Sequence, residues 1–160
     1  MKFSALVLAT LLLSPVMEVN AAGGGGSGGG VGATAKVDPV LQAANAAIAR
    51  KDWSTAQSSL KQALESNAQN ADYHNLYAFS LRKAPNPDMD AVFSHYEEAL
   101  RIDPRHLGAH EYIGEAYLMV GNLAKAKEHL ATLDKLCFLP CEQYSDLTEA
   151  VAKYQRSHPG

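Results

Sequence analysis

Residues 107–130, LGAHEYIGEAYLMVGNLAKAKEHL, decide the fold of this chain. Apolar residues recur at a helical spacing on both sides of Gly121 and Asn122. Glycine is common just past a helix end, and asparagine is common as the residue that caps a helix start. The stretch therefore predicts two helices joined by a tight turn.

Small residues stand at matching places in these two helices. Gly114 and Ala126 would let two antiparallel helices approach closely, while Tyr117 and Leu130 would fill the space between them. An apolar face alone would not place small residues so specifically, so the pattern disfavours a generic helical bundle.

The helical pattern continues in both directions without the alternation typical of strands. Alanine and leucine are abundant, whereas the chain holds one tryptophan and four phenylalanines, which favours close-packed helices. The sequence predicts helices at about 38–50, 53–66, 71–84, 88–101, 107–120, 123–136 and 141–156.

The helices pair with a period near ~34 residues, which is typical of helical-repeat proteins. With Gly114 and Ala126 at the small-residue positions, the third pair resembles the tetratricopeptide-repeat (TPR) family. The resemblance covers about residues 37–140 and implies an all-α, right-handed superhelical stack of about three TPR helix pairs. The repeats would span about 37–70, 71–106 and 107–140, with a capping helix at about 141–156; the TPR domain would be 37–160.

The second repeat departs from the family in one place. Its turn, Ala84 to Asp88, is about two residues longer than the family standard. In the first repeat, Ala44 and Ala47 stand where the family usually has glycine and tyrosine.

The resemblance implies a function as well as a fold. The first helix of each TPR pair lines a concave surface that binds a peptide or protein partner. Carried over by position, that partner-binding groove would comprise Asn45, Ile48, Asn75, Phe79, Arg82, Lys83, Glu111, Glu115, Leu118 and Met119. Some TPR proteins grip a terminal carboxylate with a set of Lys, Asn and Arg side chains, but that set is not assembled here.

The charges in this groove change sign along it. Arg82 and Lys83 are basic, whereas Glu111 and Glu115 lie one helical turn apart and repel each other slightly. Two explanations remain open. The acidic pair faces a cation or a basic partner, or Glu115 forms a salt bridge with Arg82 between repeats.

The N-terminus has the features of a signal peptide. Lys2 precedes an apolar stretch over Ala5 to Leu13, and small residues precede a predicted cleavage after Ala21. The apolar stretch is too short to span a bilayer, although an uncleaved anchor is the alternative. Residues 1–21 are therefore predicted to be a signal peptide and 22–36 a Gly-rich flexible linker, in a periplasmic or secreted protein.

The two cysteines, Cys137 and Cys141, lie four residues apart in LCFLPCE. An even number of cysteines in an exported chain favours a disulfide. Closing a ring this small would contribute about 2 kcal/mol through chain entropy. The alternatives are a Cu or Zn site completed by a histidine such as His129, and a redox-active thiol pair.

Six histidines are many for a chain of 160 residues. His106 and His110 have a spacing that metal ligands use on one helix face, but position 110 usually carries a buried aromatic in TPRs. We expect His110 and His74 to be core residues. We expect His95, His129 and His158 to face solvent.

Composition narrows the function further. A formal net charge of −3 gives no basic surface for nucleic acid, and the chain lacks a phosphate-binding loop. The one catalytic combination, His110 with Glu111 and Glu115, lacks support, so we expect no enzyme, no cofactor and no resident metal. The leading hypothesis is an exported non-catalytic scaffold with a protein or peptide partner and no stable membrane insertion. The alternative is an envelope protein that handles Cu or Zn through Cys137, Cys141 and nearby histidines.

Overall fold

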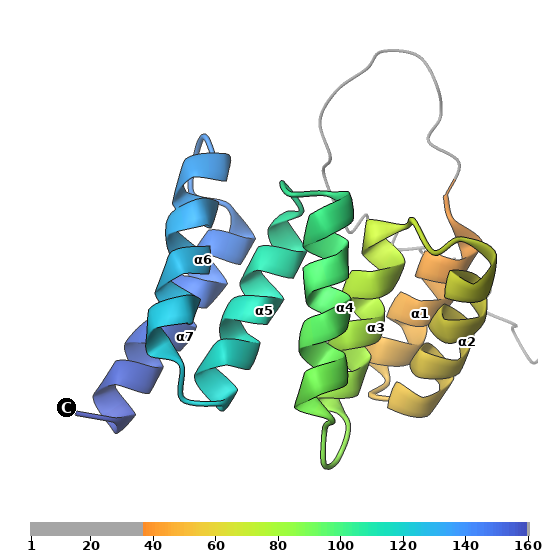
Figure 1. Ribbon diagram of the computed structural model, residues 1–160, viewed down its shortest axis with the longest axis horizontal. Coiled ribbons are helices and arrows are strands. Elements are labelled where there is room, and N and C mark those ends of the chain that lie inside the picture. The colour runs from red at the N-terminus through yellow and green to blue at the C-terminus, as the bar shows by residue number, and fades with distance from the viewer. Residues whose placement is uncertain (1–36, 160) are drawn as a thin grey trace, which may run out of the picture. The chain divides into compact units, whose positions relative to one another are not determined.

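The computed structural model describes residues 37–159, and they form seven α-helices with no strand among them (Figure 1). The helices are α1 (Pro39–Ala49), α2 (Trp53–Ser66), α3 (Ala71–Lys83), α4 (Met89–Ile102), α5 (Leu107–Met119), α6 (Leu123–Leu136) and α7 (Glu142–Ser157). Each predicted helix is confirmed, with ends within about one residue of the prediction. No helix in this range is long and apolar enough to cross a membrane. The predicted signal peptide and linker lie outside the described residues.

Short polar side chains fix where the helices begin. The first N–H groups of a helix have no partner within it, and a cap residue supplies an acceptor. Asp52 accepts from the N–H of Thr55, and Asn122, the predicted cap of α6, accepts from Lys125 at 3.1 Å. Such capping by the preceding side chain occurs at α1 to α6.

Two helix ends share one turn geometry. After α5, Gly121 has a positive φ of 80°, and the Asn122 N–H donates to the Tyr117 carbonyl at 2.8 Å. This is the arrangement that the Gly-Asn pair predicted. After α1, Lys51 takes the same left-handed conformation with φ of 58°, although it has a side chain.

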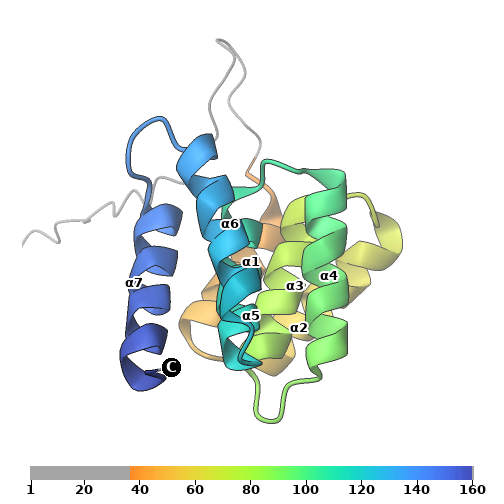
Figure 2. The ribbon, with the colours of Figure 1, turned by 60° about the vertical axis from the view of Figure 1, so that its left-hand side comes forward.

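The helices stack as antiparallel pairs. α1 packs on α2, α3 on α4 and α5 on α6, and the second helix of each pair packs on the first helix of the next. α1, α3 and α5 also contact one another in succession, so they share one face of the stack (Figures 1 and 2). This confirms the all-α stack of helix pairs.

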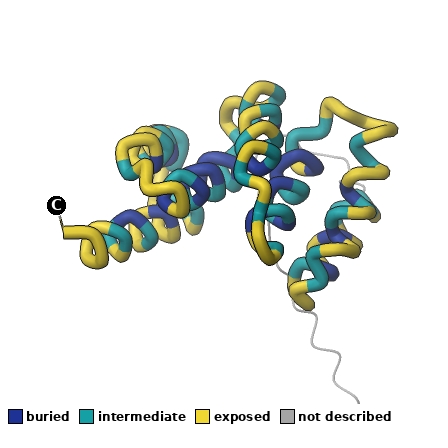
Figure 3. The backbone as a smooth tube through the Cα atoms, turned by 60° about the horizontal axis from the view of Figure 1, so that its bottom comes forward, coloured by how far each residue is buried: buried dark blue, intermediate teal, exposed yellow. Residues whose placement is uncertain are grey.

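Small residues occupy the closest contacts between helices. Ala44, Ala78, Ala116 and Ala126 are completely buried, as the close approach of two helix backbones requires. Figure 3 shows buried positions on the inner sides of the helices and exposed ones along the loops and at the C-terminal end.

Gly114 has a different neighbour from the one expected. A Cβ atom on Gly114 would lie 2.6 Å from Cδ2 of Leu147, which belongs to α7. The sequence predicts that Gly114 admits the antiparallel helix of its own pair, α6. Its missing side chain instead makes room for α7.

Two polar contacts join successive pairs at the helix starts. The Tyr73 hydroxyl donates to Asp38 at 2.7 Å, and His106 Nε2 lies 3.0 Å from Asp72 Oδ1. Asp38 is the residue before α1, and Asp72 is in the first turn of α3. The two contacts therefore join successive helix pairs along the same edge of the stack.

Replacing Lys51 by glycine should stabilise the protein by about 1 kcal/mol, because a side chain is disfavoured in the left-handed region and glycine is not. Urea unfolding followed by circular dichroism measures the change. Lys61→Gly, within α2, is the control and should destabilise by about 1 kcal/mol. A loss of stability in both variants would contradict the assignment.

Candidate functional site

Arg82 is a buried charged residue of the predicted groove. It lies on α3 and is only 4% exposed. Its Nη2 is 2.6 Å from Glu115 Oε2 on α5, and its Nε donates to the Tyr96 hydroxyl on α4 at 3.3 Å. Of the two explanations for the acidic pair, the salt bridge between repeats is therefore present for Glu115.

Aromatic rings surround this guanidinium. Its Cζ atom lies 5.5 Å from the ring centre of Phe79 and 5.7 Å from that of Tyr112. The two ring centres are 4.7 Å apart, and Trp53 on α2 meets the other side of Phe79 at 6.3 Å. Lys83 Nζ lies 5.4 Å from the Phe79 ring centre, and the cation–π contacts add to the ordering of this row.

A hollow of about 400 Å³ opens next to this row, near the C-terminal ends of α3, α5 and α7. Its walls include Arg82, Lys83, Glu115, Leu118, Met119 and Tyr154. Met119 is half exposed, so the lining of the hollow offers apolar surface to solvent. A second hollow, of about 450 Å³, lies between α1 and α2 and is lined by Val40, Ala63 and Tyr73 among others.

The predicted groove residues divide into two groups. Phe79, Arg82, Lys83, Glu115, Leu118 and Met119 lie together around the aromatic row and its hollow. Asn45 and Ile48 lie apart on α1, where Asn45 is exposed and Ile48 half-buried. Asn75 is buried, and its Oδ1 has no hydrogen-bond partner in the described part of the chain.

Glu111 is also removed from the open groove, because its residue is only 6% exposed. Burial and the nearby carboxylates of Glu115 and Asp146 together raise the pKa of its carboxyl to about 8. Of the two explanations left open for the acidic pair, the salt bridge with Arg82 accounts for Glu115, whereas Glu111 is buried and takes no part in that salt bridge.

Two histidines of the second pair of helices meet ring to ring. His74 Nδ1 on α3 lies 2.9 Å from His95 Nδ1 on α4, and His74 Nε2 lies 3.1 Å from the Ala68 carbonyl. A carbonyl only accepts, so Nε2 carries a hydrogen and the neutral ring has an unprotonated Nδ1. His95 must then donate its Nδ1–H to His74.

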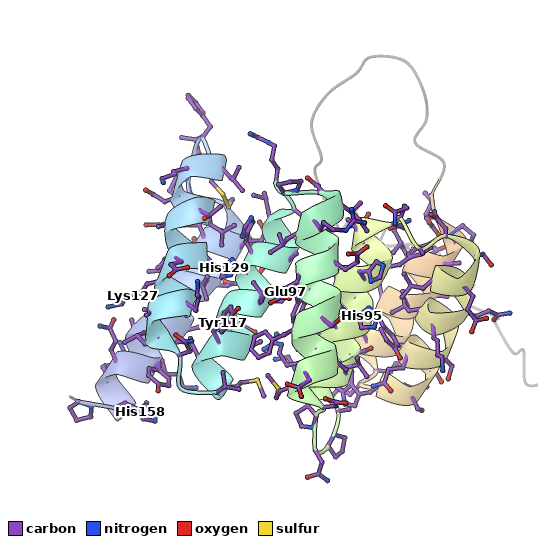
Figure 4. All side chains as sticks on the ribbon, in the orientation of Figure 1. His95, Glu97, Tyr117, Lys127, His129 and His158 are labelled. Atoms are coloured by element: carbon purple, nitrogen blue, oxygen red, sulfur yellow. A yellow bond between two sulfur atoms is a disulfide. The ribbon has the colours of Figure 1, made fainter. Side chains whose placement is uncertain are left out.

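The third pair repeats this arrangement. His110 and His129 are 2.9 Å apart at Nδ1, and His110 Nε2 lies 3.1 Å from the Pro104 carbonyl. The predictions of a buried His74 and a buried His110 are confirmed. The prediction that His95 and His129 face solvent is wrong, since both are half-buried. Figure 4 labels these two histidines, which lie on α4 and α6.

The two histidine pairs have a signature in the sequence that is easy to overlook. The residues are 21 apart in the second repeat and 19 apart in the third. The difference matches the longer turn at Ala84 to Asp88, so in repeat register the pairs coincide. The spacing of the two histidines in both repeats, taken together, indicates that they pair. No single histidine indicates this.

The geometry of each histidine pair is that of a hydrogen bond between the two rings. Ring centres stand 5.1 and 5.2 Å apart with the Nδ1 atoms 2.9 Å apart, so the rings meet nearly end to end. His106 does not join His110, because its Nδ1 accepts from the Ala109 N–H and its Nε2 faces Asp72. Within residues 37–159, no group of three or more His, Cys, Asp or Glu could hold a metal ion.

Cys137 and Cys141 form the predicted disulfide, with Cα atoms 5.9 Å apart. The bond closes the corner between α6 and α7. Phe138 and Leu139 stand at its tip, and Phe138 is 100% exposed. Because the two sulfur atoms are bonded to each other, they cannot act as thiolate ligands. The alternative of a Cu or Zn site therefore lacks the two thiolates on which it was based.

Comparison with known proteins supports the fold. No protein-family model matches the chain, and no curated protein sequence matches it either. Among solved structures, the chain is similar to the Yersinia enterocolitica type III secretion translocator chaperone SycD, with TM-score 0.64, 12% identity and coverage of 74% of this chain and 82% of that one.

Two further structures are similar over the same share of the chain, 74%. The Arabidopsis OM64 TPR domain gives TM-score 0.61 at 18% identity over 93% of its length. The first TPR domain of human RPAP3 gives 0.58 at 16% identity over 94% of its length. The fold of residues 37–159 is therefore that of a TPR domain.

Glu111 should make the protein less stable as the pH rises. Its pKa is about 8 in the folded chain against an ordinary 4.5, so the folded state holds this proton more tightly. The stability this provides is full below about pH 4.5 and is lost as the pH rises to about 8. Urea unfolding across this range should show a smaller decline for Glu111→Gln than for the parent. Glu149→Gln, on an exposed position, should keep the parent profile.

His129 should act in the opposite direction. Burial and the neighbouring His110 lower its pKa to about 4 from 6.5. The associated stability is present above about pH 6.5 and is lost as the pH falls to about 4. His129→Asn, whose amide can donate in place of Nδ1–H, should flatten this decline. If His129→Asn leaves the loss of stability between about pH 6.5 and pH 4 unchanged, the pKa of His129 is not lowered. His158→Asn, at an exposed position, is the control.

Proposed function

We propose that this chain is an exported, non-catalytic TPR scaffold that binds a peptide or protein partner through the concave surface of α1, α3 and α5. The observation that carries the proposal is the row of Phe79, Tyr112 and buried Arg82 beside an open hollow. Aromatic and arginine side chains in a partly desolvated groove are the residues that usually dominate binding energy.

The similar structures support a role in protein–protein interaction. Two of them are TPR domains, and the third is described as a translocator chaperone. Those descriptions belong to those proteins, and the low identities leave the partner of this chain open. The groove itself has few exposed charges beyond Lys83 and Lys153, so it suits a largely apolar segment.

The proposed export rests on the sequence of residues 1–21, with its short apolar stretch and small residues before Ala22. The Cys137–Cys141 disulfide supports it, because such bonds persist mainly in oxidising compartments. We do not pursue the Cu- or Zn-handling alternative, since its thiolates are bonded to each other.

A photoreactive phenylalanine analogue at position 79 tests the groove. In living cells it should crosslink one or a few specific proteins, because Phe79 lies in the aromatic row. The same analogue at Lys127, an exposed position on α6, is the control and should not capture them (Figure 4). Lys83→Glu should reduce capture at position 79 by about tenfold, equivalent to about 1.4 kcal/mol, whereas Lys127→Glu should not. Identical captures at both positions would refute the groove.

Mass spectrometry of the protein recovered from its native cell tests export. The mature chain should begin at Ala22, and it should contain the disulfide before any reductant is added. A chain that retains residues 1–21, or that carries two free thiols, would contradict export with cleavage.

A further inference from the structure

The last helix differs from the others in what it packs against. α3 contacts the preceding helix, α2, more than it contacts α1, and α5 contacts α4 more than it contacts α3. α7 reverses this preference, because it contacts α5 more than it contacts the preceding helix, α6. α5 is the first helix of the third repeat, so its concave side faces the groove. α7 therefore covers the part of the concave surface that belongs to the third repeat.

Two residues of α7 are buried. Leu147 and Val151, four residues apart, are the buried residues of this 16-residue helix. Leu147 fits against Gly114, where a side chain on α5 would collide with it. The start of α7 has no side-chain cap, unlike the starts of α1 to α6.

The ionisable groups that meet at Glu111 across this contact are all acidic. Glu111 on α5 lies near Glu142 and Asp146 of α7, both of which carry carboxylates. Glu111 has no hydrogen bond or ion pair in the described part of the chain, because Arg82, the nearby cation, is bonded to Glu115. α7 thus covers a carboxyl that has no ion-pair partner and brings two further carboxyl groups near it, which disfavours its own docking.

We propose that α7 is an internal occupant of the third-repeat groove, displaced by an amphipathic helix of the partner that carries aliphatic residues four apart and a lysine or arginine facing Glu111. This inference rests on the proposed function, since the groove is the same concave surface. The aliphatic pair would take the places of Leu147 and Val151, and the cation that of Asp146.

The chemistry favours such a helix over α7. An amphipathic helix reads a groove through apolar residues at i and i+4, which is the spacing that Leu147 and Val151 already show. A cation next to Glu111 would supply the counter-charge that α7 lacks and would favour the ionised carboxylate. Burial of a charge that is paired is much less costly than burial of one that is not.

Two synthetic peptides test the inference directly on the full chain. One has the sequence of residues 142–157, and the other carries Glu142→Lys and Asp146→Lys in that sequence. Fluorescence anisotropy should show the lysine peptide binding at least about tenfold more tightly than the parent peptide. Glu111→Gln in the protein should remove most of that difference, because the charge that the lysines recognise is gone.

Variants of α7 in the full chain provide the second arm. Leu147→Ala weakens the docking of α7 and should raise affinity for the lysine peptide at least about fivefold, although it lowers stability. If Leu147 had only a structural role, Leu147→Ala would lower both the affinity for the peptide and the stability of the protein. Asp146→Lys should pair with Glu111, hold α7 in place and weaken peptide binding. Glu149→Lys, on an exposed position of the same helix, is the matched control and should leave binding unchanged.

Equal affinities for the two peptides, or the same affinity for Leu147→Ala and the parent protein, would overturn the inference. A failure to bind either peptide would overturn it as well. Neither result bears on the capture at position 79, because Phe79 is on α3 and lies outside the area that α7 covers. The groove could then bind its partner with α7 in place.

Discussion

Everything in this stack depends on helices lying close enough for their backbones to be almost in contact. Ala44, Ala78, Ala116 and Ala126 have no exposed surface, and each stands where a larger side chain would push two helices apart. The first helices of the three pairs, α1, α3 and α5, contact one another in succession and share one face of the stack. That face is where Arg82 ties α3 to α4 and α5 through Tyr96 and Glu115.

Features that depend on nearby residues could be predicted from the sequence. The turn at Gly121 and Asn122 followed from glycine's access to a positive φ and from the capping amide, and both are present. The disulfide likewise follows from two cysteines four residues apart. Features that depend on distant residues could not be predicted in the same way. The residues next to Glu111 in the sequence do not indicate that α7 will cover it. The residues next to His95 do not indicate that its ring will bond to His74.

One half of the groove is open and the other half is covered. Both halves are formed by the first helix of a repeat, α3 in the open half and α5 in the covered half. On α3, Phe79 and Lys83 remain accessible beside the hollow, and the buried Arg82 orders the rings around it. On α5, Glu111 and Gly114 lie beneath α7. A scaffold whose last helix covers its own groove has a built-in competitor for its partner, so the strength of the α5–α7 contact helps set the affinity of the whole surface.

The paired histidines have a consequence for charge. In each pair the two Nδ1 atoms share one hydrogen, so a first added proton converts the contact into an imidazolium–imidazole bond and leaves it intact. Only a second proton sets two donors against each other. Burial and the neighbouring His110 hold the pKa of His129 at about 4, so this ring stays neutral in mild acid. The ring-to-ring hydrogen bond between α5 and α6 is therefore a polar contact that adds no charge to the interior of the third helix pair.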